Sequence, residues 1–595
     1  MSKAIGRRTK IVATLGPASS DPVVLAAMIK AGMDVARFNM SHGDHAQHEH
    51  VLAALREATE RAGKDVTLLF DLRGPEVRLL LPGGGPLAVQ PDLVIPLPST
   101  TWSGFAAAVA AGAKVLLADG AVVAEALPAT GQHGQRLRFL SSGLLRDRSK
   151  VAIPGVRADL PPLAPQDLAD IAFAVEAGAE VFAMSFVQEA SDVLELRDYL
   201  QQLGSPAMTI AKIETRLGYQ NLRPILSVCD GAMVARGDLG VECSFEEIPL
   251  MQKEILALCN RLGKPGITAT EMLESMTRQP RPTRAEASDV FNAVLDGTDA
   301  VMLSGETAIG QYPVETVEAM YRIVLQAERV WADRWEGGRR TRALTGYAEG
   351  SGSGQITPAV AIADAAVAAG EAVRAAAIIT PTRSGYTARM VSRLRPQVPV
   401  LAVSSHPATV SALRLSWGVE PLLSDEAGRG GDPVETALDA AATAGLIASG
   451  DMVVVTAGVP ANVPGTTNML QLRTIGEVVA RGAGIAAAAV GGHAAPAVSG
   501  TLRVVAQATE LEQRFDPGDV IATDATDASY VPFMQRAAAV LTVEGGLSSH
   551  AAVVCLSLGK PVIVGVRNAL QLPDGETVTV DAAHGVVYRG RVQPG

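Results

Sequence analysis

Between residue 10 and about residue 332, the sequence alternates eight short apolar runs with segments whose apolar residues recur at helical spacing. Apolar runs of about four to eight residues are typical of strands that are buried in a parallel sheet. Eight such strands, each followed by a helix, favour a (β/α)8 barrel, an α/β fold, over an open, doubly wound sheet. The expected strands lie within KIVATLG, DVARFNM, VTLLFDL, EVFAMSFV, MTIAKIE, GAMVARGD, PGITATEM and AVMLSGET.

Polar side chains stand at or just beyond the carboxyl ends of these apolar runs. In (β/α)8 barrels the active site lies at the carboxyl ends of the strands. The sequence therefore predicts a catalytic site at this mouth of the barrel. The residues concerned are Arg37, Asn39, Asp71, Ser185, Lys212, Glu214, Arg236, Asp238, Thr270, Ser304 and Glu306.

One interval interrupts the alternation after the third expected strand. Residues 74–157 carry the Pro- and Gly-rich clusters LLLPGGGP and IPLPS and the β-rich segments KVLLADGAVV and QRLRFL. The interval is too long for an ordinary loop. We interpret it as a small inserted β domain that forms a lid over the barrel mouth, so that the barrel comprises residues 1–73 and 158–338.

Two low-complexity stretches divide the rest of the chain. A polar linker rich in Gly and Ser opens the segment 339–476, in which strands and helices then alternate again as a smaller α/β domain. The Ala- and Gly-rich stretch 481–499 is expected to be a second tether. The final domain is assigned to residues 500–595, which are β-rich and contain one helical run, HAAVVCLSLG.

Composition narrows the classes of function. The chain has 595 residues, with 51 Lys and Arg against 62 Asp and Glu, and this net charge of −11 disfavours nucleic-acid binding, which needs a basic surface. No run of about 18 uncharged apolar residues predicts a membrane helix, and no signal peptide is recognised. The four cysteines show no C-x-x-C spacing, so a cytoplasmic location is expected.

Lys212 and Glu214 lie two residues apart on one expected strand, so their side chains point to the same side. Asp238 follows the next strand. A charged pair inside a barrel is unfavourable unless it serves a site. Two carboxylates and a lysine at the mouth favour a magnesium site beside a phosphate group. On spacing alone, a purely structural Lys–Glu ion pair is the alternative.

Eight motifs then support a resemblance to a known family. They are TKIVATLGPAS, GMDVARFNMSHG, DLRGPEVR, AKIE, MVARGDLGVE, ATEMLESM, PRPTRAEASDV and MLSGETA, in the order found in pyruvate kinases. From about residue 8 to residue 475 the chain resembles that family, which implies a barrel with a lid domain, a C-terminal α/β domain and a homotetramer. The resemblance also implies transfer of the phosphoryl group of phosphoenolpyruvate to ADP, giving pyruvate and ATP in glycolysis, with Mg2+ (or Mn2+) and K+ as cofactors.

The resemblance implies a role for each residue that matches the family motifs. Lys212 stabilises the moving phosphoryl group, Arg37 contacts the phosphate, and Thr270 belongs to the route by which the enolate is protonated. The substrate carboxylate is oriented by Gly237, Asp238 and Thr270. The divalent metal ligands are Glu214 and Asp238. The monovalent-cation ligands are Asn39, Ser41, Asp71 and the carbonyl group of Leu72. The nucleotide contacts are Asn39, Met40, Ser41, His42, Arg78, Asp119 and Lys150.

Some positions depart from the family pattern. The usual DTKGPE is DLRGPE, which places Leu72 and Arg73 where Thr and Lys are usual, and the segment around Lys150 is one residue shorter. In the family, a Glu at the position of Glu76 accompanies potassium dependence, whereas Leu72 resembles the independent group. Because Glu76 sets the local charge and Leu72 offers only its carbonyl group, we expect activation by K+.

The α/β domain contains a hydroxyl-rich turn, TPTRSGYTAR, at the start of an expected helix. Helix N-terminal amides together with hydroxyl groups can bind a phosphate. In the family this loop binds phosphorylated allosteric effectors. We therefore expect effector contacts here, with an ordinary N-cap turn as the alternative. The residues are Thr382, Ser384, Gly385 and Thr387.

The tail carries a second resemblance. LTVEGGLSSHAAVVCLSLGKPVIVG is similar to the swivelling phosphohistidine domain of phosphoenolpyruvate-utilising enzymes, in which the histidine matching His550 accepts a phosphoryl group. A phosphoenolpyruvate synthase or pyruvate phosphate dikinase is thus an alternative function, but it would need a nucleotide-binding domain ahead of the histidine domain. A non-catalytic metabolite sensor is another, which the intact barrel motifs argue against. We expect His550 to be a relic or a regulatory element.

Overall fold

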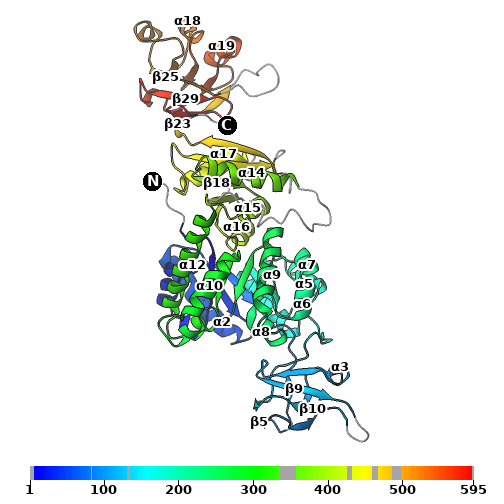
Figure 1. Ribbon diagram of the computed structural model, residues 1–595. Coiled ribbons are helices and arrows are strands. Elements are labelled where there is room, and N and C mark those ends of the chain that lie inside the picture. Colours follow the sequence, from blue (N-terminus) through cyan, green and yellow to red (C-terminus); the bar gives the residue numbers. More distant parts are fainter. Residues whose placement is uncertain are drawn as a thin grey trace. The chain divides into compact units, whose positions relative to one another are not determined.

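Figure 1 shows the computed structural model of the chain, which describes residues 6–81, 83–129, 134–335, 357–424, 432–458, 467–485 and 497–592. The chain forms two compact units, one of residues 5–363 and 381–430, the other of residues 1–4, 364–380 and 431–595. Among the described residues, no helix combines the length and the apolar character that are needed to cross a lipid bilayer.

Eight parallel strands close into a barrel in the order β1-β17-β16-β15-β14-β13-β3-β2. Their residues are almost all buried, because helices cover the outer face and apolar side chains fill the interior. The predicted (β/α)8 barrel is confirmed, and each strand lies within one of the predicted apolar runs. The strands are β1 (Lys10–Thr14), β2 (Val35–Asn39), β3 (Thr67–Asp71), β13 (Val181–Met184), β14 (Met208–Ile213), β15 (Gly231–Ala235), β16 (Gly266–Ala269) and β17 (Ala300–Leu303).

Several barrel helices begin at a side chain that caps them. Asp21, Asp44 and Thr283 each accept a hydrogen bond from a backbone N–H group in the first turn of the helix that follows. The helices are α1 (Pro22–Ala31), α2 (His45–Ala62), α4 (Pro165–Ala177), α5 (Ala190–Gln202), α6 (Arg216–Gln220), α7 (Leu222–Val228), α8 (Arg236–Glu242), α9 (Ile248–Leu262), α10 (Arg284–Leu295), α11 (Gly305–Ala308) and α12 (Pro313–Trp335), with short 3-10 turns η1 (Pro17–Ser19) and η2 (Glu274–Thr277).

The interval after β3 folds as a separate set of antiparallel strands around its own apolar core, which includes Trp102, Phe105 and Phe139. This is the small β domain that the sequence predicts, and it belongs to the same unit as the barrel. Its elements are β4 (Leu79–Leu80), β5 (Leu87–Val89), β6 (Val94–Pro96), β7 (Ser99–Thr100), α3 (Phe105–Ala108), β8 (Lys114–Leu117), β9 (Val122–Leu127), β10 (Arg136–Phe139), β11 (Gly143–Leu145) and β12 (Val151–Ala152).

Strands and helices alternate again after the predicted linker, most of which lies outside the described residues. In the barrel's unit, β19 and β20 pair in parallel, and the buried Arg395 binds Asp299 and Asn260 of the barrel at 2.8 and 2.7 Å. In the other unit, β21 pairs in parallel with β18 and antiparallel with β22. The elements are α14 (Pro358–Ala372), β18 (Ala377–Pro381), α15 (Tyr386–Ser392), β19 (Val400–Ser404), α16 (Pro407–Leu413), β20 (Val419–Leu423), α17 (Pro433–Thr443), β21 (Met452–Gly458) and β22 (Thr467–Thr474).

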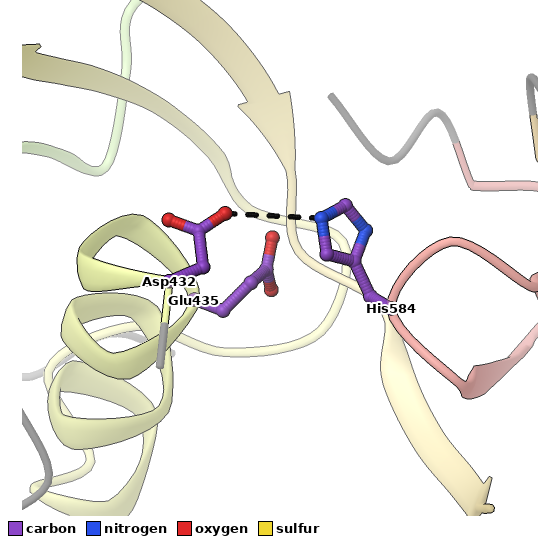
Figure 2. Close-up of side chains that lie close together, drawn as sticks. All are labelled: Asp432, Glu435 and His584. Atoms are coloured by element: carbon purple, nitrogen blue, oxygen red, sulfur yellow. Dashed lines mark ion pairs between the residues drawn. The ribbon is translucent and has the colours of Figure 1, made fainter. Parts of the chain in front are cut away.

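The tail forms an eight-stranded sheet in the order β23-β30-β29-β25-β26-β27-β28-β24. This sheet begins at Glu477, upstream of the predicted domain start at residue 500. Its strands β23 and β24 lie next to and within the stretch 481–499, which the sequence predicts to be a tether. In the turn after β29, His584 lies beside α17 (Figure 2). The elements are β23 (Glu477–Arg481), β24 (Ala483–Ile485), β25 (Val498–Val504), η4 (Ala508–Gln513), β26 (Val520–Thr523), η5 (Ala528–Tyr530), α18 (Val531–Met534), β27 (Ala539–Thr542), α19 (His550–Leu558), β28 (Val562–Val564), η6 (Ala569–Gln571), β29 (Thr577–Asp581) and β30 (Val586–Arg589).

Candidate active site

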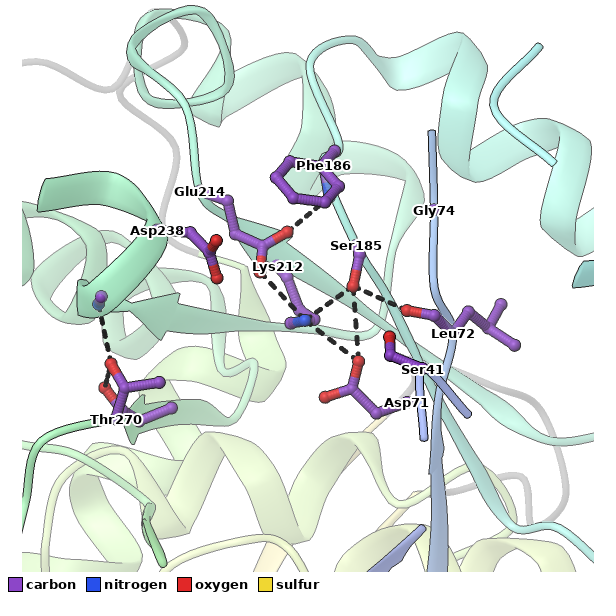
Figure 3. A network of polar contacts seen from close by, with 12 residues as sticks. Ser41, Asp71, Leu72, Gly74, Ser185, Phe186, Lys212, Glu214, Asp238 and Thr270 are labelled. Atoms are coloured by element: carbon purple, nitrogen blue, oxygen red, sulfur yellow. Dashed lines mark hydrogen bonds and ion pairs between the residues drawn. The ribbon is translucent and has the colours of Figure 1, made fainter. Parts of the chain in front are cut away.

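Lys212, on β14, is the centre of a buried polar network at the barrel mouth (Figure 3). Its ammonium group donates to Ser185 Oγ at 2.6 Å and to Asp71 Oδ1 at 3.0 Å, and it lies 2.9 Å from Glu214 Oε1. Burial lowers the pKa of Lys212, but the two carboxylates outweigh burial and raise this pKa above its usual range. The lysine is therefore a fixed cation with three partners, which stand at the ends of β3, β13 and its own strand β14, and this is more than an isolated ion pair.

Arg37, on β2, brings a second buried cation to the same carboxylate. Its Nε donates to Asp71 Oδ2 at 2.7 Å, and its Nη1 donates to Thr14 Oγ1 at 2.8 Å. Burial raises the pKa of Asp71, but Arg37 and Lys212 outweigh it and hold that pKa below its usual value. Asp71 thus stays ionised and fixes the positions of two cations at the mouth.

Glu214 and Asp238 supply two carboxylates on the other side of Lys212 (Figure 3). Glu214 is buried, and its Oε2 accepts a hydrogen bond from the backbone N–H of Phe186 at 2.6 Å. Its Oε1 has the ammonium group of Lys212 beside it and is otherwise unpartnered among the described residues. Burial raises the pKa of Glu214, and the nearby charge of Asp238 raises it further, while Lys212 lowers it in part. Two carboxylates that repel each other, one of them with a buried oxygen that accepts no hydrogen bond from the described residues, are suited to hold a cation.

Lys150 reaches this carboxylate pair from the lid domain. Its Nζ lies 2.6 Å from Asp238 Oδ1, 3.2 Å from Glu76 Oε1 and 4.4 Å from the ring centroid of Phe186. Burial lowers the pKa of Lys150, but the carboxylates of Asp238 and Glu76 outweigh burial and raise this pKa. A cation therefore lies against Asp238 in this structure, which supports the electrostatic suitability of the site for a metal ion.

The lid and the barrel enclose a cavity of about 30 Å3 at this point, lined by residues that include Asp119, Lys150, Glu214 and Asp238. Such a volume has room for a water molecule or two and none for a nucleotide. The structure thus shows the lid in contact with the barrel mouth.

Thr270 follows β16 and adopts a left-handed backbone conformation, with φ of +66°. Its Oγ1 accepts a hydrogen bond from the backbone N–H of Gly237 at 2.8 Å and donates to the carbonyl oxygen of Ala269 at 2.7 Å. Left-handed backbone in a β-branched residue is unfavourable by about 1–3 kcal/mol and is concentrated at functional sites. The geometry connects the ends of β15 and β16 at the place where the sequence predicts substrate contacts.

Two residues of this site were noted in the sequence without a role. Arg236 donates to the carbonyl oxygen of Thr270 at 2.6 Å and pairs with Asp289 at 2.7 Å, so it holds the strained turn in place. Ser185 accepts from Lys212 and lies 2.7 Å from the carbonyl oxygen of Leu72. The sequence signal for both residues was their position at the carboxyl end of an apolar run. A polar residue at such a position can be placed at the barrel mouth, but its contacts cannot be predicted from the sequence.

The residues predicted to bind a monovalent cation lie together at the ends of β2 and β3. Asn39 is in register with Asp71, and its Oδ1 accepts from the backbone N–H of Ser41 at 3.1 Å. The carbonyl oxygen of Leu72 faces Ser185, while the Leu72 side chain is buried. The replacement of Thr by Leu at position 72 therefore leaves the expected carbonyl ligand at the site (Figure 3).

The residues predicted to contact the nucleotide are divided between barrel and lid. Met40 is buried, whereas His42 is exposed and its carbonyl oxygen lies 3.0 Å from Nε2 of His48. In the lid, Arg78 forms an ion pair with Glu76, and Asp119 lines the small cavity.

The predicted effector residues Thr382, Ser384 and Gly385 lie between β18 and α15, and Thr387 lies in the first turn of α15. Thr382 Oγ1 accepts from the backbone N–H of Gly385 at 3.0 Å, and Gly385 caps the helix with φ of +75°. Ser384 is exposed and Thr387 is buried. The hydroxyl group of Thr382 thus closes the turn, as the N-cap alternative expects.

In the tail, His550 is the first residue of α19 and follows the N-cap residue Ser549. Its Nδ1 lies 2.8 Å from Thr526 Oγ1. The hydrogen bond to Thr526 fixes the orientation of the imidazole ring at the start of the helix.

Family models match three parts of the chain. Residues 6–317 match the barrel domain of pyruvate kinase, residues 360–472 match the alpha/beta domain of pyruvate kinase, and residues 515–585 match the mobile domain of PEP-utilising enzymes. Both resemblances seen in the motifs are thus confirmed.

Individual proteins match over nearly the whole length. A pyruvate kinase of Geobacillus stearothermophilus is 44% identical, and one of Bacillus licheniformis is 43% identical, each alignment covering 98% of this chain and 99% of the relative. The crystal structure of a pyruvate kinase from Cryptosporidium parvum superposes with a TM-score of 0.69 at 34% identity, covering 79% of this chain and 96% of that one.

Proposed function

The chain belongs to the pyruvate kinase family and catalyses transfer of a phosphoryl group from phosphoenolpyruvate to ADP, and we propose that the network around Lys212 carries out this reaction. The observation that carries the proposal is a buried ammonium group fixed between Asp71 and Glu214 at the catalytic end of the barrel. Phosphoryl transfer needs mainly positioning and charge neutralisation. A fixed cation of raised pKa meets that need.

Lys212 and Arg37 neutralise the phosphoryl oxygens of phosphoenolpyruvate. Both cations are buried, so their interaction with a phosphate is screened less than it would be in water. Because Asp71 binds both of them, neither has to reorganise when charge develops in the transition state.

Glu214 and Asp238 would hold a divalent metal ion, Mg2+ or Mn2+. The fit rests on the buried Oε1 of Glu214 and on the lysine that now neutralises Asp238. When bound, such an ion neutralises and orients substrate oxygens. Glu214 directly follows β14, and Asp238 lies in the first turn of α8, so both carboxylates are positioned by regular structure.

For ADP to reach the cavity lined by Asp119, Lys150, Glu214 and Asp238, the lid domain would have to move away from the barrel, because this cavity is about 30 Å3. On opening, Lys150 leaves Asp238 and becomes available to the phosphates of ADP. Asp119, Arg78 and the segment Asn39–His42 are proposed as its other contacts.

Thr270 and the backbone N–H groups of Gly237 and Asp238 orient the carboxylate of the substrate. The hydroxyl group of Thr270 already bonds Gly237, so it lies at the place where that carboxylate is expected. We assign the same hydroxyl group to the route that delivers a proton to the enolate after phosphoryl transfer.

The potassium requirement is tested through Glu76. Glu76 forms ion pairs with both Arg78 and Lys150. Replacing Glu76 by a lysine would therefore change the net charge next to the active site from negative to positive at this position. We expect faster initial rates in potassium than in tetramethylammonium chloride of equal ionic strength, and we expect Glu76→Lys to reduce this ratio, since the new ammonium group supplies positive charge. Asn39, Ser41, Asp71 and Leu72 are the proposed K+ ligands. Equal rates of the wild type in the two salts would contradict this assignment.

Regulation and assembly are proposed by family likeness. A phosphorylated effector would contact Thr382, Ser384, Gly385 and Thr387, and the exposed hydroxyl group of Ser384 supports this. The functional form is proposed to be a cytoplasmic homotetramer.

The tail offers the competing reaction, in which His550 would carry the phosphoryl group. We expect His550→Ala to form pyruvate from phosphoenolpyruvate and ADP at a rate within about twofold of the wild type, because every barrel residue of the site is retained. The measurement is a coupled pyruvate assay run with ADP and, in parallel, with AMP plus phosphate. If His550→Ala formed no pyruvate, the result would favour the dikinase reaction instead.

A further inference from the structure

Three side chains that could ligate a metal ion converge between α17 and the tail, in the second compact unit (Figure 2). Asp432 precedes α17, Glu435 lies on its first turn, and His584 lies in the turn between β29 and β30. Each offers one ligand atom, and the three atoms lie within 4.8 Å of one another. His584 is about 150 positions from Asp432 and Glu435 in sequence, so only the fold brings it to them.

The imidazole of His584 is oriented as it is in metal sites. Its Nδ1 lies 2.8 Å from Oδ2 of Asp581, a buried carboxylate that can only accept, so Nδ1 carries a proton, and in the neutral imidazole Nε2 keeps its lone pair. Metal-binding histidines usually donate their second N–H group to a carboxylate in this way. Asp581 also accepts from the backbone N–H groups of Ala583 and His584, which fixes the turn.

The spacing of the ligand atoms suits a bridging ion better than a direct contact. His584 Nε2 lies 3.7 Å from Asp432 Oδ2, beyond hydrogen-bonding distance. Two ligand atoms that are each about 2.0–2.2 Å from one ion are separated by roughly 2.8–4.4 Å. The other oxygen of Asp432 caps α17 by accepting from Val434 N–H at 2.9 Å, so Oδ2 is the one that faces the histidine.

The charges around the cluster also favour a cation. Asp432, Glu435 and Asp581 bring three carboxylates, and Arg473, which binds Glu435 Oε1 at 2.7 Å, neutralises one of them. A second contact joins the same two elements, since Arg481 of the tail forms an exposed ion pair with Asp439 of α17 at 3.0 Å. One imidazole nitrogen with carboxylate oxygens is a ligand set that suits first-row divalent transition metals, whereas Mg2+ and Ca2+ prefer oxygen ligands alone.

We propose that Asp432, Glu435 and His584 bind a divalent transition-metal ion, with Zn2+ as the probe, and that this ion fastens α17 to the β29–β30 turn of the tail. Water completes the coordination, because the cluster is partly exposed. The site is separate from the phosphoryl-transfer network and shares no residue with it.

The full chain is first stripped of metal with EDTA. It is then titrated with Zn2+ in competition with a chromophoric chelator, and saturating Mg2+ is present to occupy the active site. The pH is 8, because Asp581 and the other carboxylates outweigh burial and raise the pKa of His584, so a proton competes for the ring at lower pH. We expect the wild type to bind one Zn2+ more per chain than His584→Ala. We expect Asp581→Asn to bind this ion about 10- to 100-fold more weakly.

His406→Ala is the matched control, because His406 is exposed and lies outside the cluster. It should bind Zn2+ as the wild type does. Pyruvate formation by His584→Ala should equal that of the wild type, and an unchanged circular dichroism spectrum of the metal-free protein shows that the variant is folded. Equal Zn2+ stoichiometry and affinity in the wild type and in His584→Ala would overturn the proposal, as would an equal loss in His406→Ala.

Discussion

Lys212→Met is expected to lower kcat by about 100- to 1,000-fold while changing the KM for phosphoenolpyruvate far less. A fixed charge that is aimed at the transition state contributes about 2.7–4 kcal/mol, and most of that contribution is realised only as charge moves. Arg37 remains to bind the ground-state phosphate, since it is held by Asp71 and Thr14. Steady-state kinetics with both substrates varied measure the two constants separately.

Lys212→Arg serves as the control for folding. Removing one partner of a buried ion pair destabilises proteins by about 3–5 kcal/mol, and Lys212→Met leaves Glu214 without its cation. The arginine variant keeps the positive charge but cannot place a compact ammonium group between Ser185 and Asp71. We expect it to fold like the wild type, as judged by circular dichroism and Tm, and still to lose most of its kcat. Turnover near the wild-type value in folded Lys212→Met would remove Lys212 from the mechanism, whereas full turnover in Lys212→Arg alone would show that the charge matters and the compact ammonium group does not.

The barrel was predictable because each of its strands can be recognised from the sequence of that strand alone. Strands that are buried on both faces must be almost continuously apolar, so runs such as MTIAKI and GAMVA identify β14 and β15 without any knowledge of their partners. The tail was less predictable. Its strands β23 and β24 are short, and β24 lies in an Ala- and Gly-rich stretch, so pairing with β30 and β28 decides their conformation.

The sequence predicted which residues lie at the barrel mouth, but it did not predict most of the contacts between them. Lys212, Glu214 and Asp238 follow from strand-end positions and from the family motifs. The pairing of Lys150 with Asp238 does not, because it depends on how the lid packs against the barrel. The support that Arg236 gives to Thr270 depends on a left-handed turn that a threonine rarely adopts. Contacts between elements far apart in sequence require the fold.

Glu214→Gln is expected to raise the Mg2+ concentration needed for half-maximal activity and to lower activity about 100-fold or more at the concentration that saturates the wild type. The substitution keeps the size of the side chain and removes the charge of the buried Oε1 that we propose as a ligand. A metal ion at a transferring phosphate contributes several kcal/mol to transition-state stabilisation, and each 1.4 kcal/mol corresponds to about tenfold. Initial rates over a Mg2+ series, at saturating substrates, give both quantities.

The alternative explanation is that Glu214 acts only by orienting Lys212, and Ser185→Ala distinguishes the two. Ser185 also contacts Lys212, at 2.6 Å, but is not a proposed metal ligand. Its loss should lower kcat and leave the Mg2+ requirement unchanged, since the carboxylates of Glu214 and Asp238 are retained. Excess Mg2+ should partly restore Glu214→Gln and should not restore Ser185→Ala. If both variants respond to Mg2+ as the wild type does, Glu214 positions Lys212 and the metal ligands lie elsewhere at the barrel mouth.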